Sequence, residues 1–387
     1  MYKLHRIHNT KVDVLIVDRV LSDNIISCIS SDVTVCIADN PSRGVIPYVN
    51  RLMFFIRVIK NILSFGLSNK AKVLFASIID ELEPRVIITF IDNNYLLGTL
   101  SKIYPKKKFI SVQNGVRFGN ANSIGKGVDG YIFGDYYTFG LFEKDLYLSL
   151  GGELSNHYPI GSLKLGIFLS TYDNSGLDKT DDVKTICFIS QYRKKTSLSN
   201  KLLDREFVDA SKELYKLTVL FALDKGYKVL VAMAHQKNDN DYKDEINYFK
   251  EISNTKNIQL SDNNREEMTS YKNAMCSDII IGMDSTLMIE MLGCKKKVIW
   301  GSTCDNEFLR KRAGLAYKER MPEEIVLDNL SEKSFNKKVM HLLDIDKEEY
   351  LRLISNARYY FMNMNKVTGY PHEVIKNNID KYLSKNG

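Results

Sequence analysis

The 387-residue sequence predicts an α/β protein with two Rossmann-like domains that face each other across a cleft, followed by a C-terminal helical tail. Three observations support this fold class. Short apolar runs alternate with longer helical stretches, which is typical of βαβ units and parallel sheets. The alternation occurs in two series, and a polar stretch separates them. The chain also exceeds the length that one hydrophobic core usually supports, so two domains are expected.

In the first series, the apolar runs predict buried parallel strands, and the stretches between them predict helices. The expected strands are 11–18, 33–39, 85–92, 108–113 and 130–135, and the expected helices are 50–65, 70–82 and 94–103. These elements define an N-terminal domain over residues 1–165. The helical run RLMFFIRVIKNILSF (51–65) is basic and rich in aromatic side chains, as in helices that lie on a membrane interface. Core packing is favoured for it, because the helices that flank a doubly wound sheet need an apolar face.

The second series predicts a C-terminal domain over residues 183–355. Its expected elements are a strand at 184–190, a helix at 205–225, a strand at 227–234, a helix at 240–253, a strand at 258–260, a strand–turn–helix–strand unit at 279–300 and a strand at 324–327. The polar, glycine-bearing stretch 166–182 is interpreted as the linker. Residues 331–384 are predicted to be helical with a break at Gly369–Pro371, and 356–387 form the tail.

Composition limits the function classes. The chain has 44% hydrophobic and 26% charged residues and a net charge of +7, which fits an anionic substrate or an anionic membrane surface. The basic residues are dispersed and lack an aromatic–basic motif, so no nucleic-acid partner is expected. No run of eighteen apolar residues and no signal-peptide core occurs, which predicts a cytoplasmic protein, soluble or peripherally bound at the inner face of the membrane. The six cysteines contain no C-x-x-C pair, which favours reduced thiols over disulfides or zinc.

Ligands of open α/β sheets bind beyond the carboxyl ends of the strands, so residues that follow each strand are the site candidates. Asp284, Ser285 and Thr286 follow the apolar run SDIIIGM and precede the helical run LMIEML. Free N–H groups and the dipole at such a helix start favour phosphate, and Glu290, one turn further on, could accept from ribose hydroxyls. The alternative for Ser285 and its neighbours is ordinary N-capping.

Two further candidates follow predicted strands of the second domain. His235 comes directly after YKVLVAMA, where it could donate to a phosphate or protonate a leaving group. The alternative is a histidine that satisfies a loop carbonyl. Gln191, Tyr192 and Arg193 follow KTICFIS, and an arginine there could bind phosphate or carboxylate in two-pronged geometry. A solvated basic turn is the alternative for these residues.

In the first domain, the strand ends supply Asp92, Asn114 and Arg117. A carboxylate opposite a phosphate-binding domain is the expected base or charge stabiliser, which gives Asp92 a catalytic role. Asp92 could equally cap the helix expected at 94–103. Gly115 allows close backbone approach to a ligand, and Asn114 and Arg117 are the expected contacts beside it.

Three stretches resemble one family. They are FIDNNYLLGTLSKIYPKKKFISVQNGVR, HYPIGSLKLG and SYKNAMCSDIIIGMDSTLMIEMLGCKKKVI. They resemble bacterial surface carbohydrate biosynthesis proteins, which occur among genes for O-antigen and capsule assembly. The resemblance covers most of the chain, including RYYFMNMNKVTGYPHEVI near its end. Two Rossmann-like domains with a helical tail are also the architecture called GT-B, which many glycosyltransferases share.

A broader resemblance is to GT-B enzymes that use CMP-activated acidic sugars. These carry a His-Pro motif and a Ser-Ser or Ser-Thr motif that contact the cytidine nucleotide. His235 matches the histidine, although Gln236 stands in the proline position, and Ser285-Thr286 match the hydroxyl pair. An acidic-acidic-glycine catalytic motif is absent from the first domain. Glycerophosphate polymerases that use CDP-linked donors also resemble the second domain, with Asn114-Gly115 in place of their histidine-glycine motif.

The resemblance implies a glycosyltransferase of surface polysaccharide synthesis. The preferred donor is a nonulosonic acid linked to CMP, and the acceptor is a glycan or a lipid-linked glycan. Donor-binding roles fall to Gln191, Tyr192, Arg193, His235, Asp284, Ser285, Thr286 and Glu290, and catalytic roles to Asp92, Asn114, Arg117 and His235. No cofactor is expected. Because no Asp-x-Asp pair occurs at a strand end, no metal ion is expected either. The alternatives are a donor linked to UDP, GDP or CDP, or a non-catalytic partner in polysaccharide assembly.

Overall fold

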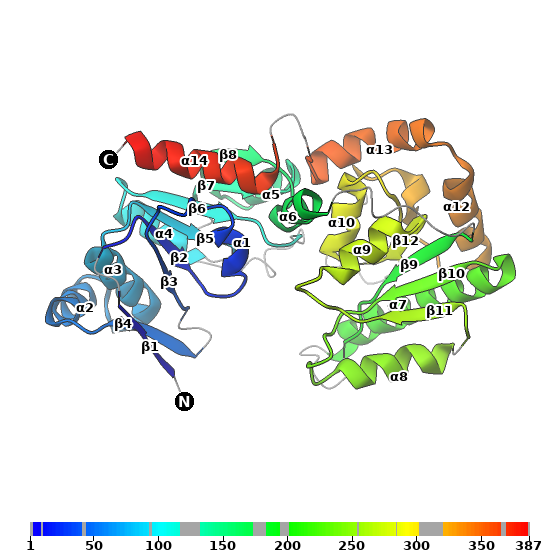
Figure 1. Cartoon of the computed structure of the whole chain (residues 1–387), viewed down its shortest axis with the longest axis horizontal. Helices are drawn as coiled ribbons and strands as arrows, with labels where there is room; N and C mark the ends of the chain where they lie inside the picture. The colour runs from blue at the N-terminus through cyan, green and yellow to red at the C-terminus, as the bar shows by residue number, and fades with distance from the viewer. Residues whose placement is uncertain are drawn as a thin grey trace. The chain divides into compact units, whose positions relative to one another are not determined.

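The computed structural model describes residues 3–8, 11–40, 44–92, 95–116, 132–172, 183–193, 201–253, 255–283, 285–301, 320–364 and 369–385. Contacts divide the chain into two compact units. Unit 1 comprises Met1–Asn114, Ile124–Ile167 and Met364–Gly387, and unit 2 comprises Gly115–Ser123 and Phe168–Asn363. Both units are of the α/β class with parallel sheets, in agreement with the predicted fold class (Figure 1).

Unit 1 contains a six-stranded parallel sheet with the strand order β3-β2-β5-β6-β7-β8. Its strands are β2 (Val14–Val17), β3 (Val35–Ala38), β5 (Val86–Thr89), β6 (Lys108–Val112), β7 (Ile132–Thr138) and β8 (Glu153–Pro159). The first five lie within or overlap the predicted runs. The strand β8 was not predicted, because it is an edge strand whose residues are mostly polar and only partly buried. A separate parallel pair, β1 (Lys3–Ile7) and β4 (Val45–Val49), was also missed.

Helices cover both faces of this sheet, which explains why its strands are almost continuously apolar. The helices of unit 1 are α1 (Ser22–Ile26), α2 (Leu52–Phe65), α3 (Lys70–Leu82), α4 (Tyr95–Ile103), α5 (Phe142–Ser149), α6 (Leu163–Thr171, which crosses the unit boundary) and α14 (Pro371–Lys385). Leu15 and Val17 of β2 pack with residues of α3 and α4. Val14 and Ile16 face the other way and pack with α14. The period of two along β2 thus separates two cores.

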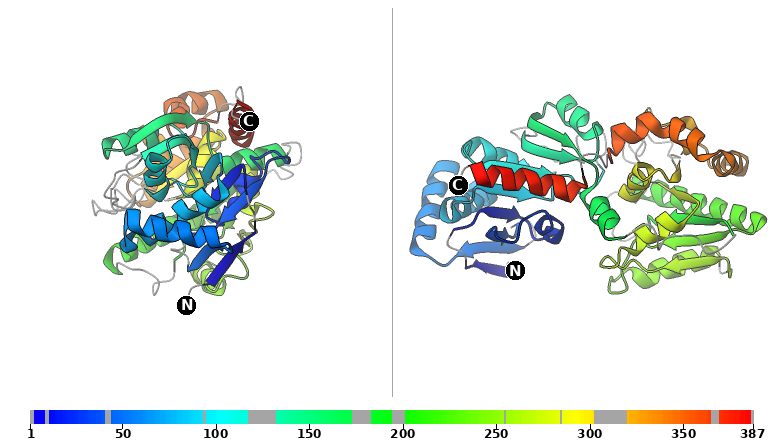
Figure 2. Two further views of the ribbon diagram at one scale, coloured as in Figure 1. Left: turned by 90° about the vertical axis from the view of Figure 1, so that its left-hand side faces the viewer. Right: turned by 45° about the horizontal axis from the view of Figure 1, so that its top comes forward.

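The C-terminal helix belongs to the N-terminal sheet. Ile375, Ile379 and Leu383 of α14 lie in the same hydrophobic cluster as the strands of unit 1, and Figure 2 shows α14 running across that sheet. Gly166 of α6 permits this docking, because a Cβ there would lie 2.5 Å from Cδ of Pro371. The range predicted as a linker, 166–182, begins inside α6, and residues 173–182 lie outside the described residues.

The helix α2 packs on the core with one face only. The sequence favoured core packing, but among its residues only Phe54 and Asn61 are buried. The reason is its position, because α2 lies against α3, and α3 already covers the sheet. Its other face is apolar and exposed. No helix among the described residues has the length and apolar character needed to cross a membrane.

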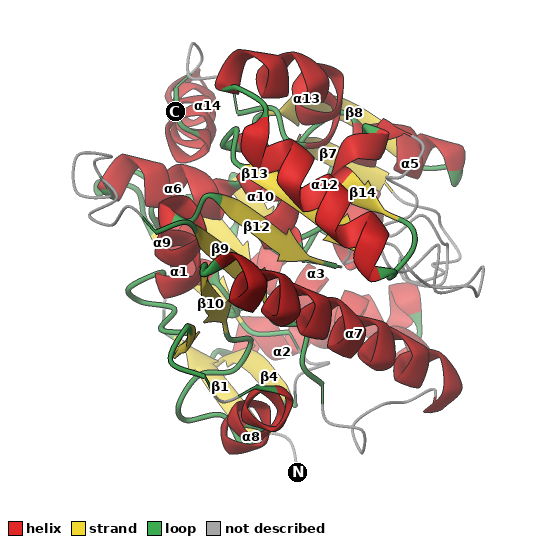
Figure 3. Ribbon diagram, turned by 90° about the vertical axis from the view of Figure 1, so that its right-hand side faces the viewer, coloured by secondary structure: helices red, strands yellow, loops and turns green. Residues whose placement is uncertain are grey.

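Unit 2 contains a six-stranded parallel sheet with the order β11-β10-β9-β12-β13-β14. Its strands are β9 (Thr185–Ile189), β10 (Lys228–Ala232), β11 (Ile258–Ser261), β12 (Ile279–Gly282), β13 (Lys297–Gly301) and β14 (Val326–Leu327). Its helices are α7 (Lys201–Lys225), α8 (Tyr242–Ile252), α9 (Thr269–Cys276), α10 (Thr286–Gly293), α12 (Glu332–Asp344) and α13 (Lys347–Phe361). Figure 3 shows α7 along one face of the sheet and α9 and α10 on the other.

The cysteines of the described residues form no disulfide bond. Cys28, Cys36 and Cys187 are buried, and burial raises the pKa of Cys28 and Cys187 to about 12 and that of Cys36 to about 11. This agrees with the predicted reduced thiols, while Cys276 and Cys294 are half-buried and Cys304 lies outside the described residues.

Stability of unit 1 should depend on His157 at acidic pH. This side chain of β8 lies 2.7 Å from Thr138 Oγ1, and burial, aided by the charge of Lys144, lowers its pKa to about 4. Between pH 6.5 and 4 the unfolded chain therefore binds a proton at this position that the folded chain does not. We expect the free energy of unfolding to fall over this range by about 2 kcal/mol, allowing for the partial exposure of the ring. Urea unfolding of the wild type and of His157→Gln at several pH values measures this fall, because only the wild type has the extra pH dependence. Parallel plots of the free energy of unfolding against pH for the two proteins would contradict the prediction.

Candidate functional site

The predicted second-domain residues follow three adjacent strands of unit 2. Gln191 follows β9, His235 follows β10 and Ser285 follows β12. The chain places β10 and β11 on one side of β9 and β12 to β14 on the other, so the order reverses between β9 and β12. Such a switch point leaves a crevice at the carboxyl ends of the strands, where doubly wound sheets bind their ligands. The three segments therefore share one edge of one sheet.

A buried carboxylate holds His235 in place. Glu245 of α8 is fully buried, and its Oε2 accepts hydrogen bonds from the N–H and from Nδ1 of His235, both at 2.9 Å. Its Oε1 accepts from the N–H of Ala234 at 2.8 Å and from the hydroxyl of Ser190. Since an ionised carboxylate only accepts hydrogen bonds, Nδ1 carries the hydrogen. The Nε2 atom is then the one that can serve a ligand, and the ring is half-buried.

The segment after β9 lies beside this histidine. The ring of Tyr192 meets that of His235 edge-on, with ring centroids 5.9 Å apart. The backbone N–H of Tyr192 donates to Ser190 Oγ at 3.2 Å. Gln191 is half-buried, whereas Arg193 is exposed with its guanidinium over the ring of Phe207 at 5.7 Å. The structure therefore brings Tyr192 and His235 together and places Arg193 against α7.

The hydroxyl pair lies at the start of α10. Ser285 is the N-cap, with extended backbone, and its side chain accepts a hydrogen bond from the N–H of Leu287 at 3.3 Å. Thr286 Oγ1 accepts a hydrogen bond from the N–H of Val116 at 3.2 Å, both residues being in unit 2. Asp284 lies outside the described residues. The capping expected for Ser285 is present, and it leaves the positive end of α10 at the carboxyl edge of the sheet.

Glu290 is held inside unit 2. It is 1% exposed, and its two carboxylate oxygens lie 2.9 and 2.8 Å from the hydroxyl of Tyr271 on α9. Burial and the Glu290 charge raise the pKa of Tyr271 well above its usual value, so the phenol remains a donor. A ribose contact by Glu290 stays a prediction, and a ribose hydroxyl would have to share the carboxylate with Tyr271.

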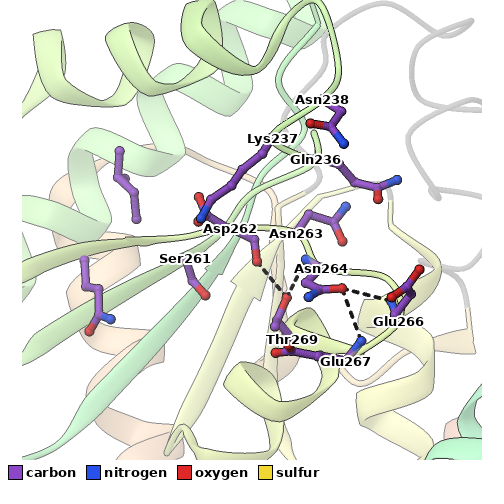
Figure 4. A pocket seen from close by; sticks show the side chains of 12 residues that line it. Gln236, Lys237, Asn238, Ser261, Asp262, Asn263, Asn264, Glu266, Glu267 and Thr269 are labelled. Atoms are coloured by element: carbon purple, nitrogen blue, oxygen red, sulfur yellow. Dashed lines mark hydrogen bonds and ion pairs between the residues drawn. The ribbon is translucent and has the colours of Figure 1, made fainter.

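A polar pocket adjoins His235. It has a volume of about 610 Å³ and is lined by the loop after β10, by the strand β11 and by the segment that follows β11. Figure 4 shows its side chains. Gln236, Asn238, Asn263 and Asn264 supply amide groups to it. Asp262 accepts from Lys237 at 2.8 Å and from the hydroxyl of Tyr242, and these hydrogen bonds lower the pKa of its carboxyl.

The first-domain candidates lie in a hydrogen-bonded region of unit 1. Asp92, after β5, is 2% exposed; its Oδ2 accepts from the hydroxyl of Tyr136 at 2.8 Å and its Oδ1 from the N–H of Asn114 at 3.4 Å. Asp92 and Asn114 are thus brought together. Arg117 lies outside the described residues, and so do residues 93 and 94, at the start of the helix that Asp92 was expected to cap. Among the residues that the structure describes, no group of three or more His, Cys, Asp or Glu is placed to hold a metal ion.

Sequence reasoning missed Glu245 and Tyr271. Glu245 is four residues before the buried Phe249 on α8, which puts its carboxylate on the inward face of that helix. This spacing was a readable signal, because a carboxylate at a core position needs hydrogen-bond donors. Tyr271 has no comparable signal, since its contact with Glu290 depends on how α9 packs against α10.

Comparisons with known proteins fit this geometry. A family model described as "putative O-antigen biosynthesis protein" matches residues 110–350, whereas no curated protein matches the chain. Three solved structures are similar in fold. A glycosyltransferase from Rickettsia africae ESF-5 has 14% identity and a TM-score of 0.51, over 97% of this chain and 98% of that one. A UDP-GlcNAc 2-epimerase from Methanocaldococcus jannaschii, in complex with UDP-GlcNAc and UDP, has 11% identity and a TM-score of 0.52, over 97% and 99%.

The third similar structure is the wall teichoic acid polymerase TagF, with 11% identity and a TM-score of 0.52 over 98% of this chain and 91% of that one. Identities this low show the fold alone. The three similar folds agree with the predicted GT-B type, in which two Rossmann-like domains are followed by helices.

Proposed function

The chain belongs to a family of O-antigen biosynthesis proteins, and we propose that it is a glycosyltransferase that transfers a sugar from a nucleotide-linked donor to a glycan acceptor in surface polysaccharide synthesis. The observation that carries the proposal is the carboxyl edge of the unit 2 sheet. There His235, held by Glu245, and the N-terminus of α10 flank the switch point between β9 and β12.

This edge is suited to a leaving nucleotide. The N-terminus of α10 presents N–H groups and the positive end of a helix dipole, which stabilise phosphate. Glu245 accepts from Nδ1 of His235, which leaves Nε2 for the ligand. When the ring is protonated, both ring nitrogens carry a hydrogen, and Nε2 can then donate to the same phosphate. The amide-lined pocket beside His235 is proposed to hold the base, since amide side chains can both donate to and accept from a base edge.

The preferred donor is a nonulosonic acid linked to CMP. On transfer of the sugar, CMP leaves as a phosphate monoester. We propose that side chains and the α10 N-terminus stabilise this leaving group without a metal ion. The M. jannaschii epimerase of similar fold is in complex with UDP-GlcNAc, which makes a UDP-linked donor the second candidate. The acceptor is proposed to be a glycan or a lipid-linked glycan presented by unit 1, with Asp92, Asn114 and Arg117 near the reacting carbon.

Thermal unfolding with CMP, CDP, UDP and GDP, with and without EDTA, identifies the nucleotide. A ligand present at about a hundred times its dissociation constant stabilises a protein by about 2.7 kcal/mol, which a melting curve resolves. Selective stabilisation by CMP that EDTA leaves unchanged is expected. Stabilisation by another nucleotide instead would mean that the donor is linked to that nucleotide. If none of them stabilises the protein, a non-catalytic role in polysaccharide assembly would be favoured.

The variant Ser285→Gly separates phosphate binding from capping. Glycine is a good N-cap, so the free energy of unfolding should change by only a few tenths of a kcal/mol. Loss of a hydroxyl that bonds a charged phosphate should cost about 1.5–3 kcal/mol of binding, or about 10- to 100-fold in the nucleotide dissociation constant. Ser331→Gly is the matched control, because Ser331 caps α12 through the same kind of bond, to the N–H of Ser334 at 3.3 Å. Equal nucleotide affinity in both variants would show that Ser285 only caps.

A further inference from the structure

The helix α2 of unit 1 exposes an apolar stripe that its packing does not use. Leu52, Ile56, Ile59 and Leu63 follow one another at steps of four, three and four residues, so they lie on one face of the helix. All four are exposed, with Leu63 at 83%, Leu52 at 76% and Ile59 at 60%. Leu67, in the 3-10 turn η2 (Leu67–Asn69) that follows, continues the stripe.

The opposite face of α2 is fixed to the protein. Phe54 is buried, and Asn61 donates to Ser77 Oγ at 3.0 Å and to Asp80 Oδ2 at 3.2 Å on α3. Arg57 pairs with Glu81 of α3 at 2.7 Å. These contacts hold α2 against α3 (Figures 1 and 2). The exposure of the stripe is therefore a consequence of the fold.

The charge around the stripe is of one sign. Residues 40–79 contain no Asp or Glu but six Lys or Arg. Lys60 and Lys70 are exposed beside the stripe, and Lys72 lies 4.9 Å from the centre of the Phe65 ring. The acids at the end of α3, Asp80 and Glu81, are engaged with Asn61 and Arg57. The surface is therefore apolar in its middle and positively charged at its border.

We propose that this face of α2 docks on an anionic phospholipid surface, with the stripe among the acyl chains and the lysines at the headgroups. An exposed apolar stripe flanked by lysines is the pattern of helices that lie in the membrane interface. The 14 residues of α2 are too few to span a bilayer, which takes about 20. A second copy of the chain is a poorer occupant, because a two-fold contact would bring the same lysines face to face.

This surface goes beyond the proposed donor site and does not depend on it. If the acceptor is lipid-linked, docking through α2 would hold unit 1 at the surface that contains it. Vesicle binding without nucleotide tests the surface alone, so its failure leaves the donor site untouched, and failure of the nucleotide screen leaves the surface untouched.

Co-sedimentation of the full chain with large vesicles tests the proposal. We expect binding to vesicles of equal parts phosphatidylcholine and phosphatidylglycerol, and weak binding to phosphatidylcholine alone. The variant Ile59→Glu with Leu63→Glu should bind the mixed vesicles at least about tenfold more weakly, because two apolar contacts are replaced by charges that anionic lipid repels. Both positions are exposed, so the melting temperature should not change. Leu220→Glu, at an exposed leucine of α7 in unit 2, is the matched control and should bind as the wild type does.

The lysines are tested separately. The variant Lys60→Glu with Lys70→Glu should bind the mixed vesicles at least about tenfold more weakly than the wild type, because both lysines attract anionic lipid. High salt should not restore its binding. Absence of wild-type binding, or equal binding by the stripe variant and the Leu220→Glu control, would overturn the proposal. A wild-type dimer that the stripe variant makes monomeric, without vesicle binding by either, would overturn it in favour of a second copy.

Discussion

Replacing Glu245 with glutamine is expected to lower turnover by about 10- to 100-fold, as loss of a partner that orients a functional histidine usually does. Glutamine keeps the size of the side chain but exchanges one accepting oxygen for an N–H₂ group. That group would face donors, because all four hydrogen bonds made by Glu245 come from Ser190, Ala234 and His235. The ring of His235 would then lose its fixed orientation at the edge of the sheet.

The same change should destabilise unit 2 by about 3 kcal/mol, because buried donors lose their acceptor. Turnover must therefore be counted per folded molecule. It is measured as release of the nucleotide that the melting screen selects, from a sugar donor linked to that nucleotide. Glu251→Gln is the matched control, since Glu251 is exposed on the same helix and should change stability by less than about 0.5 kcal/mol. Full turnover by folded Glu245→Gln would mean that His235 needs no orientation, and its catalytic role would fall with it.

The strands of both sheets were predictable because parallel strands are buried on both faces. Runs such as VIIT in β5 and VLIV in β2 are buried at every residue, which requires mostly apolar side chains. The polar edge strand β8 and the pair β1–β4 lack such a run, and their pairing depends on partners distant in the sequence. Local pattern thus identified the strands that are mostly apolar runs, the edge strands β3, β11 and β14 included, and missed β8 and the β1–β4 pair.

Placement of the helices was less predictable than their existence. The helix α3 has the bounds that the sequence indicated, Lys70–Leu82, and α2 was expected at nearly the right residues. Nothing in the sequence of α2 says that α3 stands between it and the sheet, so its apolar residues were assigned to the core. The docking of α14 on unit 1 likewise depends on a contact with Gly166 more than two hundred residues away.

Site residues divide in the same way. The rule that ligands bind beyond the carboxyl ends of strands led to His235 and Ser285 from sequence alone. It could not find Glu245, which acts from inside a helix, and it could not tell whether Glu290 faces a ligand or Tyr271. Residues that follow strands are placed by topology, whereas their supporting partners are placed by packing.

Asp92→Asn is expected to lower turnover by about 100-fold or more if Asp92 is the catalytic base, one of the two roles that the sequence predicts for it. Asparagine retains an oxygen that can accept from the hydroxyl of Tyr136, so unit 1 should remain folded and lose at most about 1 kcal/mol. The hydrogen bond that Oδ1 accepts from the N–H of Asn114 is long, at 3.4 Å, so its loss should cost little.

Tyr136→Phe is the variant that separates this role from a structural one. It keeps the charge of Asp92 but removes the hydrogen bond at 2.8 Å that a fully buried phenol donates to it. We expect it to lower the free energy of unfolding by about 1–3 kcal/mol and to change turnover per folded molecule only a few-fold. The two variants should therefore have opposite profiles, with activity lost in one and stability lost in the other. Unchanged turnover in Asp92→Asn would make Asp92 a structural partner of Tyr136, and the base would have to come from another strand end.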